Sequence, residues 1–180
     1  MNSIRVEKDF YFQAGLHFAD EFWINSYDIT LSMLVETESE YEQNIAVDRI
    51  TYYIKNVLQN SILIDCSDQD AIERYQHAGI RVCELPAEPY DQLVAYVLLL
   101  KLNSIMEGRL RITDMVLSSM MSDGIRYNVV FEDAESSYAK NKWWNKSCTS
   151  IKDDVEGDNV VRLFETNDWV DLGLSWKDSA

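Results

Sequence analysis

The chain has 180 residues, of which 47% are hydrophobic, and it carries a formal net charge of −15 at pH 7. This length is enough for one well-packed domain. The negative charge disfavours nucleic acid and anionic membrane surfaces as partners, because both would be repelled. No uncharged apolar stretch is long enough to cross a membrane, and the first residues lack a secretion signal, so we expect a cytoplasmic protein.

Cysteine and histidine are too sparse for the common structural zinc sites. The three cysteines, Cys66, Cys83 and Cys148, are widely spaced and odd in number, which favours reduced thiols over a disulfide framework. His17 and His77 are the only histidines, so a site of the Cys/His type has too few ligands close together. A magnesium or calcium site made of carboxylates stays open, because the chain has 31 acidic residues, although no calcium-loop motif is present.

Two strands joined by a hairpin near residues 18–22 are predicted for the first part of the chain. In the first strand, apolar residues alternate around a slip near Lys8, at Ile4, Val6, Phe10, Phe12, Ala14 and Leu16. In the second strand the alternation is regular, at Tyr27, Ile29, Leu31, Met33 and Val35. A period of two indicates strands that bury one face only.

Two long helices are predicted next. The stretch SEYE at 39–42 has the spacing of a capping box, which predicts a helix from about 42 to 60. SILID at 61–65 either continues this helix or forms a short strand, and a short helix near 68–77 precedes an extended piece, IRVCEL. Pro86 and Pro89 mark the start of the second long helix, which ends near Gly108. It is apolar on nearly all sides, so we expect it to pack on more than one side.

Two further strands complete the predicted fold. RLRITDMVLSSMM and IRYNVVFED are joined by the turn sequence SDG. The order of elements predicts an α+β fold for residues 1–133, a four-stranded antiparallel sheet with both long helices on one face. Residues 134–180 are predicted to be a C-terminal extension that packs on this domain, with a β-hairpin that turns near 166–168. Its Trp143 and Trp144 are candidate partner-binding residues, and the alternative is that they cover the open side of the core.

The order of elements and three short motifs resemble the tunnelling-fold (T-fold) family, in its branch of 6-pyruvoyltetrahydropterin and 6-carboxytetrahydropterin synthases. That family has Phe-x-Ala-Ala-His on its first strand, His-Gly-His-x-Tyr entering the second, and Glu-Thr-Pro with Gly-x-x-Tyr near its last hairpin. The first motif is one residue longer in this chain. The matching residues are Phe12, Ala14 and His17 in FYFQAGLHF, Tyr27 in WINSYDITLSM, and Gly124 and Tyr127 in SSMMSDGIRY.

The resemblance implies a lost zinc site. With Tyr27 on the family's tyrosine, Trp23 and Asn25 stand where the second and third zinc-binding histidines would lie, and only His17 remains. Ser119 stands where the family has its pterin-anchoring glutamate. We therefore expect neither a metal nor another cofactor, and take His17, Trp23, Asn25 and Ser119 as candidate ligand-binding residues in a former metal pocket. The alternative is that Trp23 packs at a strand end, Asn25 faces solvent, and His17 is an ordinary strand histidine.

The sequence leaves three classes of function open. No motif of a serine hydrolase, a nucleotide-binding loop or a metalloprotease is present, so no catalytic residue is identified. The resemblance implies a homo-oligomer joined through sheet edges, non-catalytic or repurposed, that binds a small planar ligand or a protein partner without zinc chemistry. The alternative is an acidic interaction protein, an inhibitor or nucleic-acid mimic that engages a basic protein partner. An enzyme that uses other residues is the third alternative.

Overall fold

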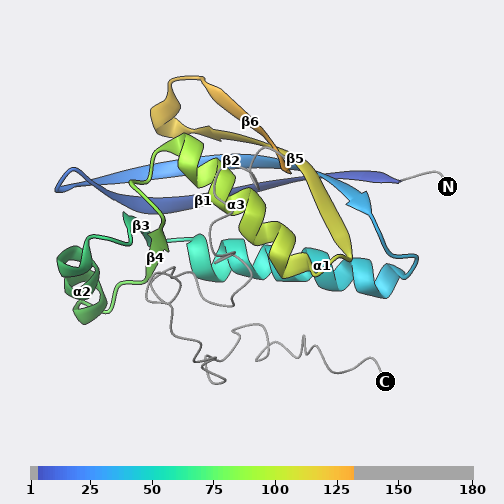
Figure 1. Cartoon of the computed structure of the whole chain (residues 1–180), viewed down its shortest axis with the longest axis horizontal. Coiled ribbons are helices and arrows are strands. Elements are labelled where there is room, and N and C mark those ends of the chain that lie inside the picture. Colours follow the sequence, from blue (N-terminus) through green and yellow to red (C-terminus); the bar gives the residue numbers. More distant parts are fainter. Residues whose placement is uncertain (1–3, 132–180) are drawn as a thin grey trace.

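The computed structural model describes residues 4–131, which form one mixed sheet with helices on both faces (Figure 1). The six strands lie in the order β4-β3-β1-β2-β5-β6. The predicted extension at 134–180, with Trp143 and Trp144, lies outside the described residues. The elements are β1 (Arg5–Phe18), β2 (Glu21–Val35), α1 (Glu40–Tyr52) continued by a π-helix (Tyr53–Leu58), β3 (Ile62–Asp65), α2 (Gln69–His77), β4 (Val82–Leu85), α3 (Asp91–Met106), β5 (Leu110–Ser119), a 3-10 turn (Met120–Ser122) and β6 (Arg126–Val130).

The four predicted strands are present, but the prediction of a sheet with only four antiparallel strands is wrong. β1, β2, β5 and β6 pair antiparallel, whereas β3 pairs with β1 and with β4 in parallel. β3 and β4 have four residues each, and three of the four in each strand are buried. A strand buried on both faces shows no alternation of polar and apolar residues, so its sequence is not distinguishable from a short helical segment.

The register of β1 and β2 decides which side chains face the two long helices. Phe12 pairs with Tyr27, Ala14 with Asn25, and Leu16 with Trp23, so these six residues share one face. Phe12 and Tyr27 are fully buried there and stack with ring centroids 4.8 Å apart. We call this the inner face, because its residues form the main core with α1 and α3, which lie together on one side of the strands in Figure 1.

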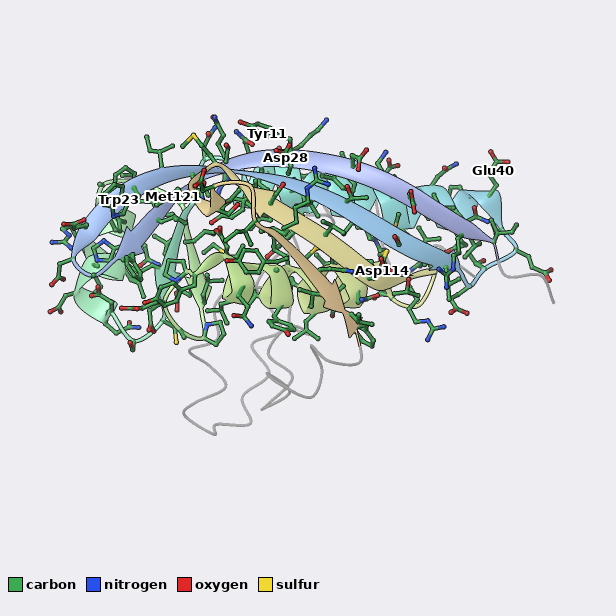
Figure 2. All side chains as sticks on the ribbon, turned by 90° about the horizontal axis from the view of Figure 1, so that it is seen from above. Tyr11, Trp23, Asp28, Glu40, Asp114 and Met121 are labelled. Atoms are coloured by element: carbon green, nitrogen blue, oxygen red, sulfur yellow. The ribbon has the colours of Figure 1, made fainter. Side chains whose placement is uncertain are left out.

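The outer face of the sheet is open over β2 and carries α2 at one end. Tyr11 pairs with Asp28, and both are exposed and point away from α3 in Figure 2. α2 packs on this outer face of β3, where a separate apolar cluster forms from Ile62, Ile64, Ala71 and Ile72. The sheet is therefore sandwiched at its β3–β4 end, with α2 opposite the two long helices.

Local signals place the helices and turns close to where the sequence predicts them. Ser39 caps α1 by accepting a hydrogen bond from the Glu42 backbone N–H, as the capping-box spacing predicts. The β1–β2 hairpin turns at Ala19 and Asp20, whose φ values of 50° and 61° lie in the left-handed region. α3 buries residues on several sides, since it contacts both the sheet and α1.

The side-chain amide of Asn103 binds α3 to the backbone near the start of β5. Asn103 accepts a hydrogen bond from the Ile112 N–H at 2.8 Å and donates one to the Ile112 carbonyl at 3.2 Å. Asn103→Ala should lower the free energy of unfolding by about 2 kcal/mol, because it leaves buried backbone groups unpaired. Urea denaturation measures this loss. Asn44→Ala, at an exposed position of α1, should change stability by less than about 0.5 kcal/mol, and equal effects would contradict the assignment.

Candidate functional site

Three polar residues from three elements meet on the inner face. Asn25 on β2 is fully buried and donates from Nδ2 to Asp91 Oδ1 at 3.4 Å. Ser119 at the end of β5 donates from Oγ to Asp91 Oδ2 at 2.6 Å. Asp91 is the first residue of α3, where the positive end of the helix dipole stabilises a carboxylate. We call these residues the Asp91 cluster.

The surroundings of the Asp91 cluster hold Asn25 in one orientation. Asn25 Oδ1 accepts from the backbone N–H groups of Ser26 at 2.9 Å and Met121 at 3.2 Å, so its Nδ2 is directed at Asp91. The Tyr27 hydroxyl lies beside Asn25 and Asp91 without a well-aligned hydrogen bond among the described residues. Burial, reinforced by the negative charge of Asp91, raises the pKa of Tyr27. The phenol therefore stays protonated, with its single O–H beside the Asp91 carboxylate.

Aromatic side chains flank this polar cluster. Trp23 lies two residues before Asn25 on the same face of β2, and its side chain is 46% exposed. Tyr90 directly precedes Asp91, is exposed, and packs edge-on against Phe18 with ring centroids 4.8 Å apart. Exposed aromatic rings next to fixed hydrogen-bonding groups suit a planar ring, which stacks on the first and is oriented by the second.

The four predicted ligand-binding residues do not all converge. The structure brings Asn25 and Ser119 together through Asp91 and places Trp23 on the same face. His17 is on the opposite face, because it pairs with Phe22, whereas Trp23 pairs with Leu16. His17 alternates with Leu16 along β1, so its side chain is on the other face from Phe12, Ala14 and Leu16.

Asp91 is the residue that sequence reasoning missed. The resemblance places Ser119 where a glutamate would stand, which removes a carboxylate from that position. In the structure, a carboxylate reaches the Ser119 hydroxyl from the start of α3. The only signal in the sequence is that Asp91 lies two residues after Pro89, at a predicted helix start. An acidic residue at that position usually has no role beyond stabilising the helix dipole.

Within residues 4–131, no helix combines the length and apolarity that a membrane span requires.

Comparisons with known proteins place the chain by its fold. No family model and no curated protein matches it. An uncharacterised protein, WS1659 from Wolinella succinogenes, is similar in structure with a TM-score of 0.52 and 11% sequence identity, over 72% of this chain and 99% of that one. A catalytic-residue mutant of 6-pyruvoyltetrahydropterin synthase from Plasmodium vivax gives a TM-score of 0.44 and 13% identity, over 71% and 96%. The similar structures therefore include a member of the family that the sequence resembles. At 11% and 13% sequence identity, the similarity concerns the fold alone.

Proposed function

We propose that this protein is a T-fold-like oligomer that binds a small planar ligand, or a protein partner, at the Asp91 cluster without zinc chemistry. The observation that carries the proposal is the position of Asp91, whose carboxylate is held by Asn25 and Ser119 on the inner face. A carboxylate fixed by two neighbours keeps lone pairs that accept from the ring N–H groups of a pterin or a purine.

The chemistry of the cluster supports a ligand that donates hydrogen bonds from ring N–H groups. Asp91 offers acceptor oxygens, and the Ser119 hydroxyl, which donates its proton to Asp91, offers its oxygen as a further acceptor. Trp23, on the same face of β2 as Asn25, and Tyr90, next to Asp91 in the chain, offer exposed rings. A heterocycle with ring N–H groups uses both kinds of contact at once, whereas an aliphatic ligand uses neither.

Assembly through sheet edges is the second part of the proposal. β6 pairs only with β5, and β4 only with β3, among the described strands. Before Gln13, β1 has β2 as its one partner strand within residues 4–131. Unpaired strand edges of this kind offer N–H and C=O groups to another chain, and a second copy satisfies them. We propose that this assembly also brings the inner-face site close to a neighbouring subunit.

A thermal-shift screen of pterins, purines and nucleotides tests ligand binding. A ligand at 100 times its Kd stabilises the folded state by about 2.7 kcal/mol, which raises the Tm by roughly 5 to 10 °C for a chain of this size. Asp91→Asn should abolish the shift, because it replaces the acceptor carboxylate by an amide of the same shape. Isothermal titration of the best compound then gives the Kd for both proteins.

Asp28→Asn is the matched control for Asp91→Asn. Asp28 is exposed on the outer face of β2, so this variant loses the same charge without touching the cluster. It should keep the full thermal shift. A screen in which no planar heterocycle raises the Tm, or in which both variants bind like the unmodified chain, would contradict the proposed ligand site.

The alternative function, an acidic interaction protein, is favoured by one specific observation. The outer face of β1 and β2 presents Glu7, Asp9 and Asp28 as exposed carboxylates, in a chain of net charge −15. Binding of a basic protein to this face would weaken strongly as salt is raised from 0.05 to 0.5 M, as a rough range, because exposed charges are screened. Ligand binding at the Asp91 cluster would change little over the same range.

A further inference from the structure

A second cluster, on the outer face, consists of His17, Asp20 and Asp68. His17 lies near the end of β1, Asp20 in the β1–β2 turn, and Asp68 immediately before α2. One ligand atom from each residue lies within 4.8 Å of the other two. The three residues are 51 positions apart at most in the chain and are brought together by the packing of α2 on the outer face.

The imidazole of His17 is the feature that points to a bound ion. His17 is only 7% exposed, and its Nε2 lies 3.1 Å from Asp68 Oδ2. This nitrogen nevertheless has no well-aligned hydrogen bond among the described residues. A buried ring nitrogen this close to a carboxylate either carries a proton and forms an ion pair with it or provides its lone pair to a cation that both bind.

The contact of the other ring nitrogen, Nδ1, favours cation binding by Nε2. His17 Nδ1 lies 3.0 Å from the Tyr75 hydroxyl, and the two rings meet edge-on. A proton on Nδ1 donated to Tyr75 leaves the Nε2 lone pair free, which is how metal-bound histidines are usually oriented. Two atoms bonded to one Zn²⁺ at about 2.1 Å lie roughly 3.0 to 3.4 Å apart, which fits the 3.1 Å separation of His17 Nε2 and Asp68 Oδ2.

The carboxylates are also placed for coordination. Asp68 caps α2 with Oδ1, which accepts from the Ala71 N–H at 3.1 Å, so Oδ2 remains available on the side of His17. Asp20 is exposed, so one side of the cluster is open to solvent and to an entering ion. One imidazole nitrogen with two carboxylates suits Zn²⁺, Co²⁺ or Mn²⁺ better than Mg²⁺ or Ca²⁺, which prefer oxygen ligands alone.

We propose that His17, Asp20 and Asp68 bind one divalent transition-metal ion on the outer face, with Tyr75 orienting the imidazole. This site is distinct from the zinc site that the family resemblance implies, because the other two positions of that site, Trp23 and Asn25, lie on the inner face. It does not depend on the Asp91 cluster. The remaining coordination positions are open to water or to a ligand atom.

Titration of the full, metal-stripped chain with Zn²⁺ by calorimetry tests the site. One ion per chain should bind, with Co²⁺ giving visible absorption bands of a coordinated site and Mg²⁺ failing to compete. Asp20→Asn and Asp68→Asn should each weaken Zn²⁺ binding by at least about tenfold. Both changes suit the local backbone, since asparagine tolerates the left-handed conformation at residue 20 and is a good helix N-cap at residue 68. Tyr75→Phe should weaken binding by about tenfold through loss of ring orientation.

Two matched controls separate this site from general binding to an acidic surface. Asp70→Asn removes an exposed carboxylate in the first turn of α2, and His77→Gln removes the other histidine of the chain. Both should keep the affinity of the unmodified protein. The proposal is overturned if no saturable binding of Zn²⁺ is seen, if Asp20→Asn and Asp68→Asn bind like the controls while folding normally, or if Mg²⁺ displaces Zn²⁺ at equal concentration.

Discussion

Glu107→Gln should lower the free energy of unfolding by about 3 kcal/mol, because it removes the carboxylate partner of a fully buried guanidinium. Arg49 on α1 is 0% exposed, and its Nη1 lies 2.8 Å from Glu107 Oε2 at the end of α3. The same oxygen lies 2.7 Å from Arg109 Nη1, and Arg109 also binds Glu42 on α1. The network ties both long helices to the start of β5. Glu107 itself is partly exposed, so the expected loss of stability is at the lower end of the range for breaking a buried ion pair.

Chemical denaturation of the single and double variants separates the effect of the lost ion pair from the effect of altered side-chain packing. Arg49→Met combined with Glu107→Gln should be more stable than Glu107→Gln alone, since the buried guanidinium is then removed together with the Glu107 carboxylate that it binds. Glu73→Gln, at an exposed position of α2, should change stability by less than about 0.5 kcal/mol. A Glu107→Gln protein as stable as the Glu73→Gln control would show that the network contributes little.

The long elements were predictable because their signals are local. β1 and β2 alternate with a period of two over most of their lengths, and Ser39 and Gly108 mark the start of α1 and the end of α3 in the sequence itself. The β3–α2–β4 unit was not recognised as part of the sheet. β3 pairs in parallel with β1 only at Gly15 and Leu16, and β4 pairs only with β3, contacts that no pattern within SILID or IRVCEL reveals.

The candidate sites were predictable only in part, for two reasons. The alternation of Phe12, Ala14 and Leu16 puts His17 on the opposite face of β1, so the motif match, and not the strand pattern, placed His17 with Trp23 and Asn25. Carboxylates give no periodic signal. Asp91 reaches Ser119 from 28 positions away, and Asp68 reaches His17 from another element, which only tertiary packing reveals. Asn25 and Ser119 were placed near each other by the resemblance alone.

Assembly should change most when an edge of the sheet is altered. Val130 lies at the end of β6, the outermost strand of the described sheet, and is partly exposed. Val130→Lys should dissociate the proposed oligomer or reduce its mass, because a lysine on an edge strand opposes pairing with another chain. Asp28→Lys is the control, since β2 already has β1 and β5 as neighbours and its outer face is exposed. It should assemble like the unmodified chain.

The mass of the full chain in solution shows whether copies of it assemble through their sheet edges. Light scattering across a range of protein concentrations should give a fixed multiple of 20.9 kDa, as expected for copies joined through their sheet edges. A mass of 20.9 kDa at every concentration would contradict the account, because a monomer has no border between subunits at which the Asp91 cluster could hold a ligand.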